Sequence, residues 1–224
     1  MKRLIFVLAL MFIFAAYVTA APRIRIIAPD GTSLKGALVK VELLDGRSYE
    51  FILDPDNPFR IKDVPLGIMK VTVVSWKGVP VGYSEEIKIG EKDVIVVPNI
   101  GKLVVRTIGS RGQSLGGVVV KVLYQGQLVE EGVTDESGIY SVLLPNANYE
   151  IRVSYGGEEK VKQVSVPGEA EFSFDVFVEL HGTPFSSTEF IGLLVLTIIL
   201  VVITYIVAVE YSNWRRRRLV KVVK

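Results

Sequence analysis

The chain has 224 residues, half of them hydrophobic, with no cysteine, a single histidine and a formal net charge of +2. The charge is unevenly spread, because residues 21–189 hold 18 Lys and Arg against 23 Asp and Glu, a net of −5, whereas residues 190–224 hold six against one, a net of +5. This composition excludes disulfides and thiolate metal sites, and the mildly acidic central region lacks the basic face that a nucleic-acid-binding domain needs.

The N-terminus has the pattern of an export signal peptide over residues 1–20. Two basic residues precede an apolar run from Leu4 to Ala16, and small residues follow where a signal peptidase would cut. We predict cleavage between Ala20 and Ala21, because a cut one residue later would place Pro22 directly after the bond. The alternative is a retained N-terminal anchor, since the apolar run is long enough to span a bilayer.

Two copies of one small β-domain are predicted to follow, over residues 22–98 and 101–180. At a constant offset of 81, residues 31–41 align with residues 112–122 with seven identities, which indicates a tandem duplication. Throughout both copies, short runs of β-branched and aromatic residues are bounded by Gly, Pro, Asn and Asp, as is typical of strands and turns.

The clearest predicted strand runs from Tyr149 to Tyr155. Its side chains alternate, so that apolar and aromatic residues share one face while Glu150 and Arg152 lie on the other. This pattern is typical of a half-buried strand in an antiparallel sandwich. The sequence therefore predicts an all-β ectodomain of two tandem antiparallel β-sandwich domains.

The second copy carries a Gly-x-Ser-Leu-x-Gly opening at residues 112–117, an acidic hairpin at residues 134–138, an aromatic Tyr140 and a Leu-Pro…Tyr step at residues 144–149. With these features it resembles the carboxypeptidase regulatory-like domains, relatives of the transthyretin-like and prealbumin-like sandwiches. In the first copy, which matches more loosely, residues 54–58 replace the hairpin, and we expect a turn of different shape there. The resemblance implies a fold and is nearly silent on function.

A short polar connector over residues 181–189 is predicted to lead into one transmembrane helix over residues 190–209. Ile191 to Val209 is nineteen residues without a charge. At 1.5 Å per residue this run covers roughly the 30 Å hydrocarbon core. The connector is short, so we expect the ectodomain to lie close to the membrane.

A basic tail, residues 210–224, closes the chain. Trp214 is followed by four cations, Arg215, Arg216, Arg217 and Arg218. The positive-inside rule places this tail in the cytoplasm and the N-terminus outside, which predicts a single-pass cell-membrane protein. The arginine run is expected to set orientation and bind anionic headgroups, and the alternative is a specific docking site.

Catalytic chemistry has few candidates in this sequence. The only histidine, His181, lies in the connector, so one chain cannot build a histidine dyad, triad or multi-histidine metal site. The best metal candidate is the oxygen-rich stretch Asp54 to Asn57, which would suit calcium, but its prolines favour a rigid turn. We therefore predict no enzyme activity, no cofactor and no metal.

Five aromatic residues are candidates for a sugar-binding platform: Trp76, Tyr83, Tyr140, Tyr149 and Tyr155. Trp76 and Tyr155 fall near the ends of equivalent long strands, which suits core packing equally, and we favour packing. A glycan ligand is therefore without specific support.

Three functions are consistent with these observations. The first is a non-enzymatic surface protein that presents two β-sandwich domains for protein or envelope contacts, with sheet edges and loops at the far end of the second sandwich as contact sites. The second is an accessory subunit of a membrane translocation, insertion or transport complex. The third is a glycan-binding module. The expected partners are the lipid bilayer and a protein of the envelope or membrane, with no nucleic acid.

Overall fold

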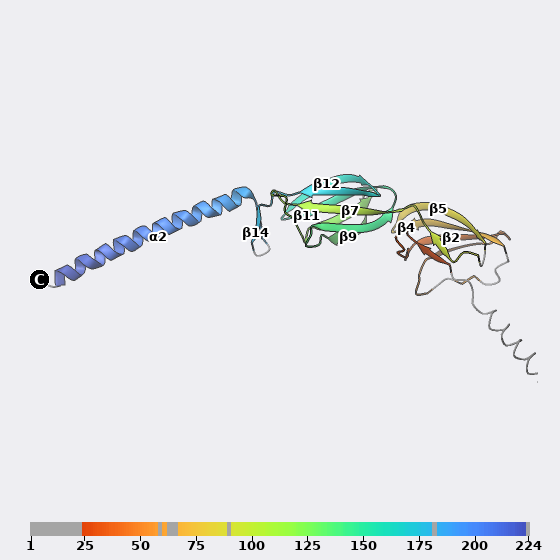
Figure 1. The fold of residues 1–224 in the computed structure, drawn as a ribbon, viewed down its shortest axis with the longest axis horizontal. Helices are drawn as coiled ribbons and strands as arrows, with labels where there is room; N and C mark the ends of the chain where they lie inside the picture. Colours follow the sequence, from red (N-terminus) through yellow and green to blue (C-terminus); the bar gives the residue numbers. More distant parts are fainter. Residues whose placement is uncertain (1–23, 58–59, 62–66, 89–90, 181–182, 223–224) are drawn as a thin grey trace, which may run out of the picture.

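The computed structural model describes residues 24–57, 60–61, 67–88, 91–180 and 183–222. Two β-rich units and one long helix, α2, follow one another along the long axis of the molecule (Figure 1). We call residues 24–97 the N-terminal unit and residues 100–176 the C-terminal unit. The predicted signal segment and its cleavage residues, Ala20 and Ala21, lie outside the described residues.

The N-terminal unit is built on a four-stranded antiparallel sheet and a two-stranded parallel one. The larger sheet has the order β3-β2-β4-β5, and the smaller pairs β1 with β6. Buried side chains from both sheets, among them Val39, Val73 and Ile95, form one core. The strands are β1 (Arg25–Ile27), β2 (Leu38–Leu43), β3 (Ser48–Ile52), β4 (Ile68–Trp76), β5 (Val79–Lys88) and β6 (Val94–Val96).

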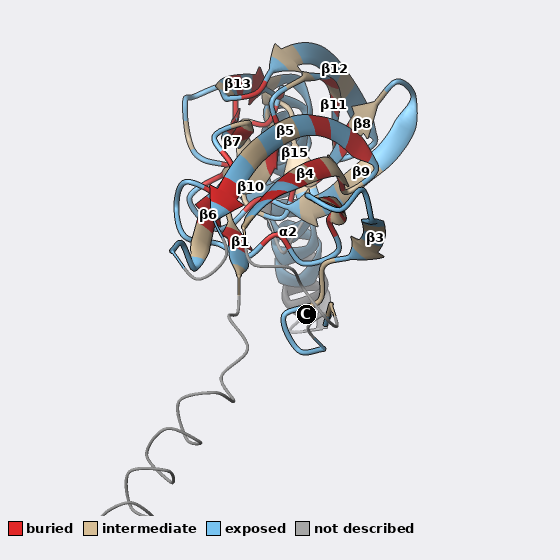
Figure 2. Ribbon diagram, turned by 90° about the vertical axis from the view of Figure 1, so that its right-hand side faces the viewer, coloured by how far each residue is buried: buried red, intermediate tan, exposed pale blue. Residues whose placement is uncertain are grey.

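The C-terminal unit is a sandwich of a four-stranded sheet, ordered β12-β11-β8-β9, and a three-stranded sheet, ordered β10-β7-β13. Its strands are β7 (Ile100–Ile108), β8 (Val119–Tyr124), β9 (Gln127–Val133), β10 (Ile139–Pro145), β11 (Asn148–Tyr155), β12 (Glu158–Ser165) and β13 (Gly168–Ser173). In β11, Tyr149, Ile151 and Val153 are fully buried, while Arg152 is exposed, as the alternation predicts. Buried residues gather on strands such as β4, β7 and β11 (Figure 2).

The predicted fold class, an all-β region followed by one helix, is confirmed. Most strand pairs are antiparallel, as expected, but one pair in each unit is parallel: β1 with β6, and β7 with β13. These parallel pairs bring together strands from the two ends of each unit. The hydrophobic period of a strand reports which face is buried and not which strand lies beside it, so the sequence held no signal for them.

The duplication is visible in the backbone, because the same hydrogen bonds recur 81 residues apart. Gly31 and Gly112 both adopt positive φ, +90° and +76°, in the loop after the first strand of their unit. The matched pairs are Gly31 N to Ala28 O and Gly112 N to Gly109 O, Leu34 N to Ile26 O and Leu115 N to Thr107 O, Gly36 N to Leu53 O and Gly117 N to Thr134 O, and Leu53 N to Ala37 O and Thr134 N to Val118 O.

The described residues between the C-terminal unit and the apolar helix include two short strands. Strands β14 (Val178–Leu180) and β15 (Thr183–Phe185) pair antiparallel, and helix α2 runs from Ser187 to Val222. The predicted connector thus holds a strand and the first turn of the helix, and α2 begins before the predicted span and continues through most of the basic tail. The helix starts early because Ser186 and Glu189 form a capping box, in which each side chain accepts the other's backbone N–H.

Candidate functional site

Among the described residues, one helix is long and apolar enough to cross a membrane, and it is the stretch of α2 from Ser187 to Arg216. From Ile191 to Trp214 its apolar side chains are exposed instead of packing against either β-unit. Exposed apolar surface of this extent is costly in water and favourable in hydrocarbon. The helix is therefore suited to anchor the chain in a membrane.

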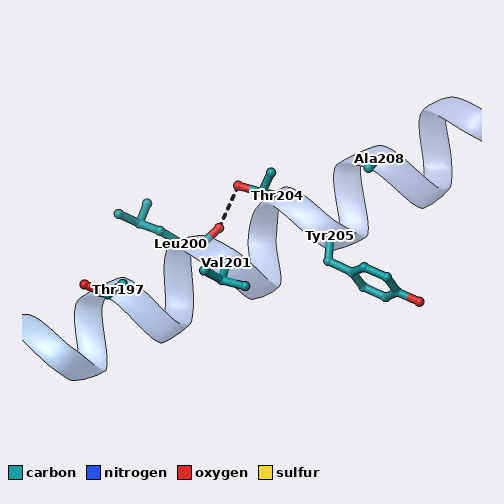
Figure 3. Close-up of a pocket in the computed structure, with 6 residues that line it drawn as sticks. All are labelled: Thr197, Leu200, Val201, Thr204, Tyr205 and Ala208. Carbon is teal, nitrogen blue, oxygen red and sulfur yellow. Dashed lines mark hydrogen bonds between the residues drawn. The ribbon is translucent and has the colours of Figure 1, made fainter.

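One face of α2 has a shallow, open hollow lined by six side chains (Figure 3). Two threonines on this face have no free hydroxyl proton, because Thr197 donates to the carbonyl oxygen of Leu193 at 2.8 Å and Thr204 donates to that of Leu200 at 2.7 Å. The face therefore presents mainly methyl groups. The residues that line it are Thr197, Leu200, Val201, Thr204, Tyr205 and Ala208.

The basic end of α2 carries the residues predicted to set topology. Arg215 and Arg216 are exposed, and the side chains of Arg217 and Arg218 lie outside the described part. One helical turn earlier, the rings of Tyr211 and Trp214 stack with centroids 6.0 Å apart. Stacked amphipathic rings beside cations are typical of a membrane–water interface. The orientation of the helix remains a prediction.

The C-terminal unit and α2 meet at a junction of aromatic residues. Phe177 donates its backbone N–H to the carbonyl oxygen of Phe185 at 2.8 Å, and its ring lies 5.4 Å from that of Phe190 in the first turn of α2. The guanidinium of Arg111 lies 5.1 Å from the centroid of the Phe177 ring. From β11, the Tyr155 hydroxyl reaches a carboxylate oxygen of Glu179 at 3.1 Å. The unit is therefore tied to the start of the helix.

The two β-units meet at a second junction, formed by the β4–β5 hairpin. Val79, in the N-terminal unit, is fully buried and belongs to the hydrophobic core of the C-terminal unit. Beside it, Lys77 Nζ lies 2.5 Å from Glu130 Oε2, and both side chains are only partly exposed. The N-terminal unit thus contacts the end of the C-terminal unit away from α2. Residues of the β8–β9 turn at that end, among them Gln127 and Leu128, are still exposed, and the expectation that this end offers contact sites stays a prediction.

The short linker between the units is held on both sides. Asn99 donates from its side-chain amide to the carbonyl oxygen of Val81 at 3.1 Å, and its own carbonyl accepts the N–H of Asn146 at 2.8 Å. The next residue, Ile100, already begins β7 and is buried in the core of the N-terminal unit. Asn99 therefore forms hydrogen bonds with both units, and Ile100 belongs to a strand of one unit and to the core of the other.

The candidate aromatic platform is dispersed into the cores. Trp76 is 5% exposed and donates its indole N–H to the carbonyl oxygen of Lys35 at 3.0 Å. Tyr149 is fully buried, and its hydroxyl donates to the carbonyl oxygen of Pro145 at 2.8 Å, four residues upstream, as in a tyrosine corner. Packing, which we favoured for these rings, is what the structure shows for both.

The candidate calcium loop has a lysine between its carboxylates. Lys35 Nζ lies 2.7 Å from Asp56 and 3.8 Å from Asp54. At the start of the turn, the backbone N–H of Asp56 donates a hydrogen bond to a carboxylate oxygen of Asp54. In the second copy, the backbone N–H of Ser137 donates to Asp135 in the same way. The described start of this turn therefore has the hydrogen bond found in the second copy, and a cation neutralises part of its charge. Residues 58–59 and 62–66 lie outside the described residues, so the expected difference in turn shape stays a prediction.

Half-buried Tyr140 and fully buried Tyr149 are expected to make the C-terminal unit sensitive to alkali. Burial raises the pKa of Tyr140 to about 12, and burial also raises the pKa of Tyr149. A tyrosine whose pKa is raised by folding stabilises the fold fully below its unfolded pKa near 10, and this contribution is lost as the pH rises towards the folded pKa. We therefore expect the free energy of unfolding to be level up to about pH 9 and to fall above pH 10.

The Tyr149→Phe variant separates the alkaline titration of Tyr149 from the contribution of its hydrogen bond. The lost hydrogen bond is expected to lower stability by about 1 kcal/mol near neutral pH. Above pH 10 the variant should lose stability less steeply than the wild type, by up to about 1.4 kcal/mol per pH unit, because one titrating group is gone. Denaturant unfolding between neutral and strongly alkaline pH measures both effects, and an unchanged alkaline slope would contradict the assignment to Tyr149.

No protein-family model matches the chain, and no curated protein matches it. Solved structures with partial similarity include the Bacillus anthracis TIE protein (18% identity, 67% of this chain and 32% of that chain, TM-score 0.31), a streptococcal ancillary pilin (13%, 67% and 60%, 0.28) and BcpA, the major pilin subunit of Bacillus cereus (16%, 65% and 52%, 0.29). The chain spans only about a third to six tenths of the length of these proteins. Similarity at this level carries no weight for function.

Proposed function

We propose that this chain is a non-enzymatic, single-pass membrane protein that presents two β-sandwich units as one extended body. The observation that carries the proposal is the continuity of its junctions. Helix α2 is capped and contacts Phe177, which Arg111 of the C-terminal unit also contacts, and that unit holds the N-terminal unit through Val79. A protein built in this way holds its outermost unit at a set distance from the membrane.

The surface of this body that would contact other proteins is then the end of the N-terminal unit that points away from its junction with the C-terminal unit. At one end of β4, Trp76 pairs with Val79 of β5, the residue buried at the junction. At the other end of β4, Met69 pairs with Leu43 of β2. The β2–β3 turn that follows Leu43 therefore lies at the free end. Sheet edges and turns at such an end are natural sites for protein contacts.

The proposal that the chain is not an enzyme rests on composition and on its buried polar groups. A single histidine and no cysteine leave few nucleophiles or bases. The two buried polar side chains among the described residues, Thr107 and Thr134, both donate to the carbonyl oxygen of Leu115, at 2.6 and 2.9 Å. These hydroxyls are committed to holding strands together.

We further propose that the C-terminal unit is a carboxypeptidase regulatory-like domain. Support comes from its seven strands in two packed sheets and from the acidic hairpin, in which Asp135 accepts the N–H groups of Ser137 and Ile139 at 2.9 Å each. For topology, we propose that the β-units lie outside and the basic tail lies in the cytoplasm, as the charge asymmetry favours.

An accessory subunit of a larger membrane complex is the second candidate. One observation favours it: the aromatic junction holds the C-terminal unit directly at the start of α2, where it can touch neighbouring membrane proteins. Purification of the full-length chain from its native membrane in mild detergent tests the two candidates. Stoichiometric integral-membrane partners would establish the subunit, and recovery alone or with envelope components would support the free-standing surface protein.

A further inference from the structure

Three phenylalanines and one arginine form a juxtamembrane cluster at the base of the C-terminal unit: Phe177, Phe185, Phe190 and Arg111. The rings are half-buried, and Arg111 is exposed. They come from three different segments, namely the β7–β8 loop, the β14–β15 region and the first turn of α2. The backbone and ring contacts described above hold them together, so the cluster is part of the folded unit.

The helix determines the depth of this cluster in a membrane. Phe190 immediately precedes Ile191, the first residue of the apolar run, so its ring lies at the edge of the hydrocarbon core. The headgroup layer extends roughly 5 to 8 Å beyond that edge. The Phe177 ring is 5.4 Å from the Phe190 ring, and the Arg111 guanidinium is 5.1 Å from the Phe177 ring. Each of these distances is similar to the thickness of the headgroup layer.

The chemistry of the cluster suits phospholipid. Aromatic and aliphatic side chains are favourable at the boundary between headgroups and acyl chains, and an arginine beside them matches a phosphate. The nearby carboxylates of Glu179 and Glu189 accept hydrogen bonds from Tyr155 and Ser186 and keep their negative charge, so Arg111 is the group of this cluster that suits a phosphate. Resting on the membrane anchoring proposed above, we propose that this cluster docks the C-terminal unit onto the phospholipid headgroups of the outer leaflet, with Arg111 on a phosphate.

Fluorescence quenching in reconstituted full-length protein tests the docking, and the absence of native cysteine allows single-cysteine labelling. Thr183→Cys places a probe on the exposed start of β15, and Gln127→Cys places a matched control at the opposite end of the same unit. Thr204→Cys reports insertion of α2. The probe lipids are phosphatidylcholine and phosphatidylglycerol vesicles with a spin label either on the headgroup or on the acyl chain.

Headgroup spin label is expected to quench the Thr183→Cys probe about threefold more strongly than the Gln127→Cys probe, because only the first lies near the headgroup layer. Adding Arg111→Gln should reduce that quenching by about half, since the phosphate contact is lost. Equal quenching at both sites, with the Thr204→Cys probe quenched by acyl-chain label, would overturn the docking and leave the anchor intact. Absence of acyl-chain quenching at Thr204→Cys would overturn the anchor itself, and the docking with it.

Discussion

Val79→Asp is expected to release the N-terminal unit from the C-terminal unit while both remain folded. The valine is fully buried in the core of the other unit, so the variant must either bury a carboxylate or withdraw the hairpin. Withdrawal is the cheaper response, because it exposes only the hairpin and its pocket. We expect the docking free energy to fall by about 3 kcal/mol, from lost apolar burial and the cost of desolvating the charge.

Calorimetry and small-angle scattering measure this release. The wild type is expected to unfold in one coupled transition, and the variant in two, with a broader distribution of interatomic distances before unfolding. Val96→Asp is the matched control, because Val96 lies in β6 and is 43% exposed, so a charge there should cost less than about 1 kcal/mol. A single unchanged transition in Val79→Asp would show that the hairpin does not couple the units.

The second large effect is expected from Gly138→Ala, which should destabilise the C-terminal unit by about 3 kcal/mol. Gly138 has φ of +69°, and a Cβ there would lie 2.5 Å from the backbone oxygen of Thr107 and 3.0 Å from the backbone nitrogen of Leu115. Both atoms belong to the pairing between β7 and the loop that follows it, so relief of the clash requires that hydrogen-bonded backbone to shift.

Gly112→Ala provides the control for backbone strain alone. Gly112 has a similar φ of +76°, but a Cβ there meets nothing within 4 Å. Its expected cost is the left-handed conformation only, about 1 to 2 kcal/mol. Denaturant unfolding of both variants gives the difference directly. Equal losses in the two variants would mean that the close approach at Gly138 relaxes without cost.

Local patterns were sufficient to predict the fold class. In the strand from Tyr149 to Tyr155, the alternation of residue types predicts which face is buried. The charge-free run that starts at Ile191 predicts a membrane span by its length alone. The capping box at Ser186 and Glu189 was also readable, and using it would have started the helix earlier. The 81-residue repeat predicted a tandem duplication, and matched backbone hydrogen bonds recur in the two units.

The junctions could not be predicted, because they depend on residues whose local pattern is ordinary. Val79 alternates like any strand valine, and nothing nearby indicates that its core lies in the other unit. Lys77 and Glu130 are 53 residues apart, and each fits a solvated position. The parallel pairing of β7 with β13 depends on packing between distant segments. For the site, the arginine run and the signal cleavage at Ala20 and Ala21 stay predictions.

The contacts between α2 and the segment before it make bilayer thickness relevant to the proposed membrane protein. A transmembrane helix tilts when the hydrocarbon layer is thinner than its apolar length. In a chain with a flexible stalk, such a tilt would stop at the membrane surface. In the anchoring proposed for this chain, the junctions at Phe177 and Val79 would transmit the tilt, and the free end of the N-terminal unit would lean and descend as the membrane thins. The height of that end above the membrane would then depend on the surrounding lipid.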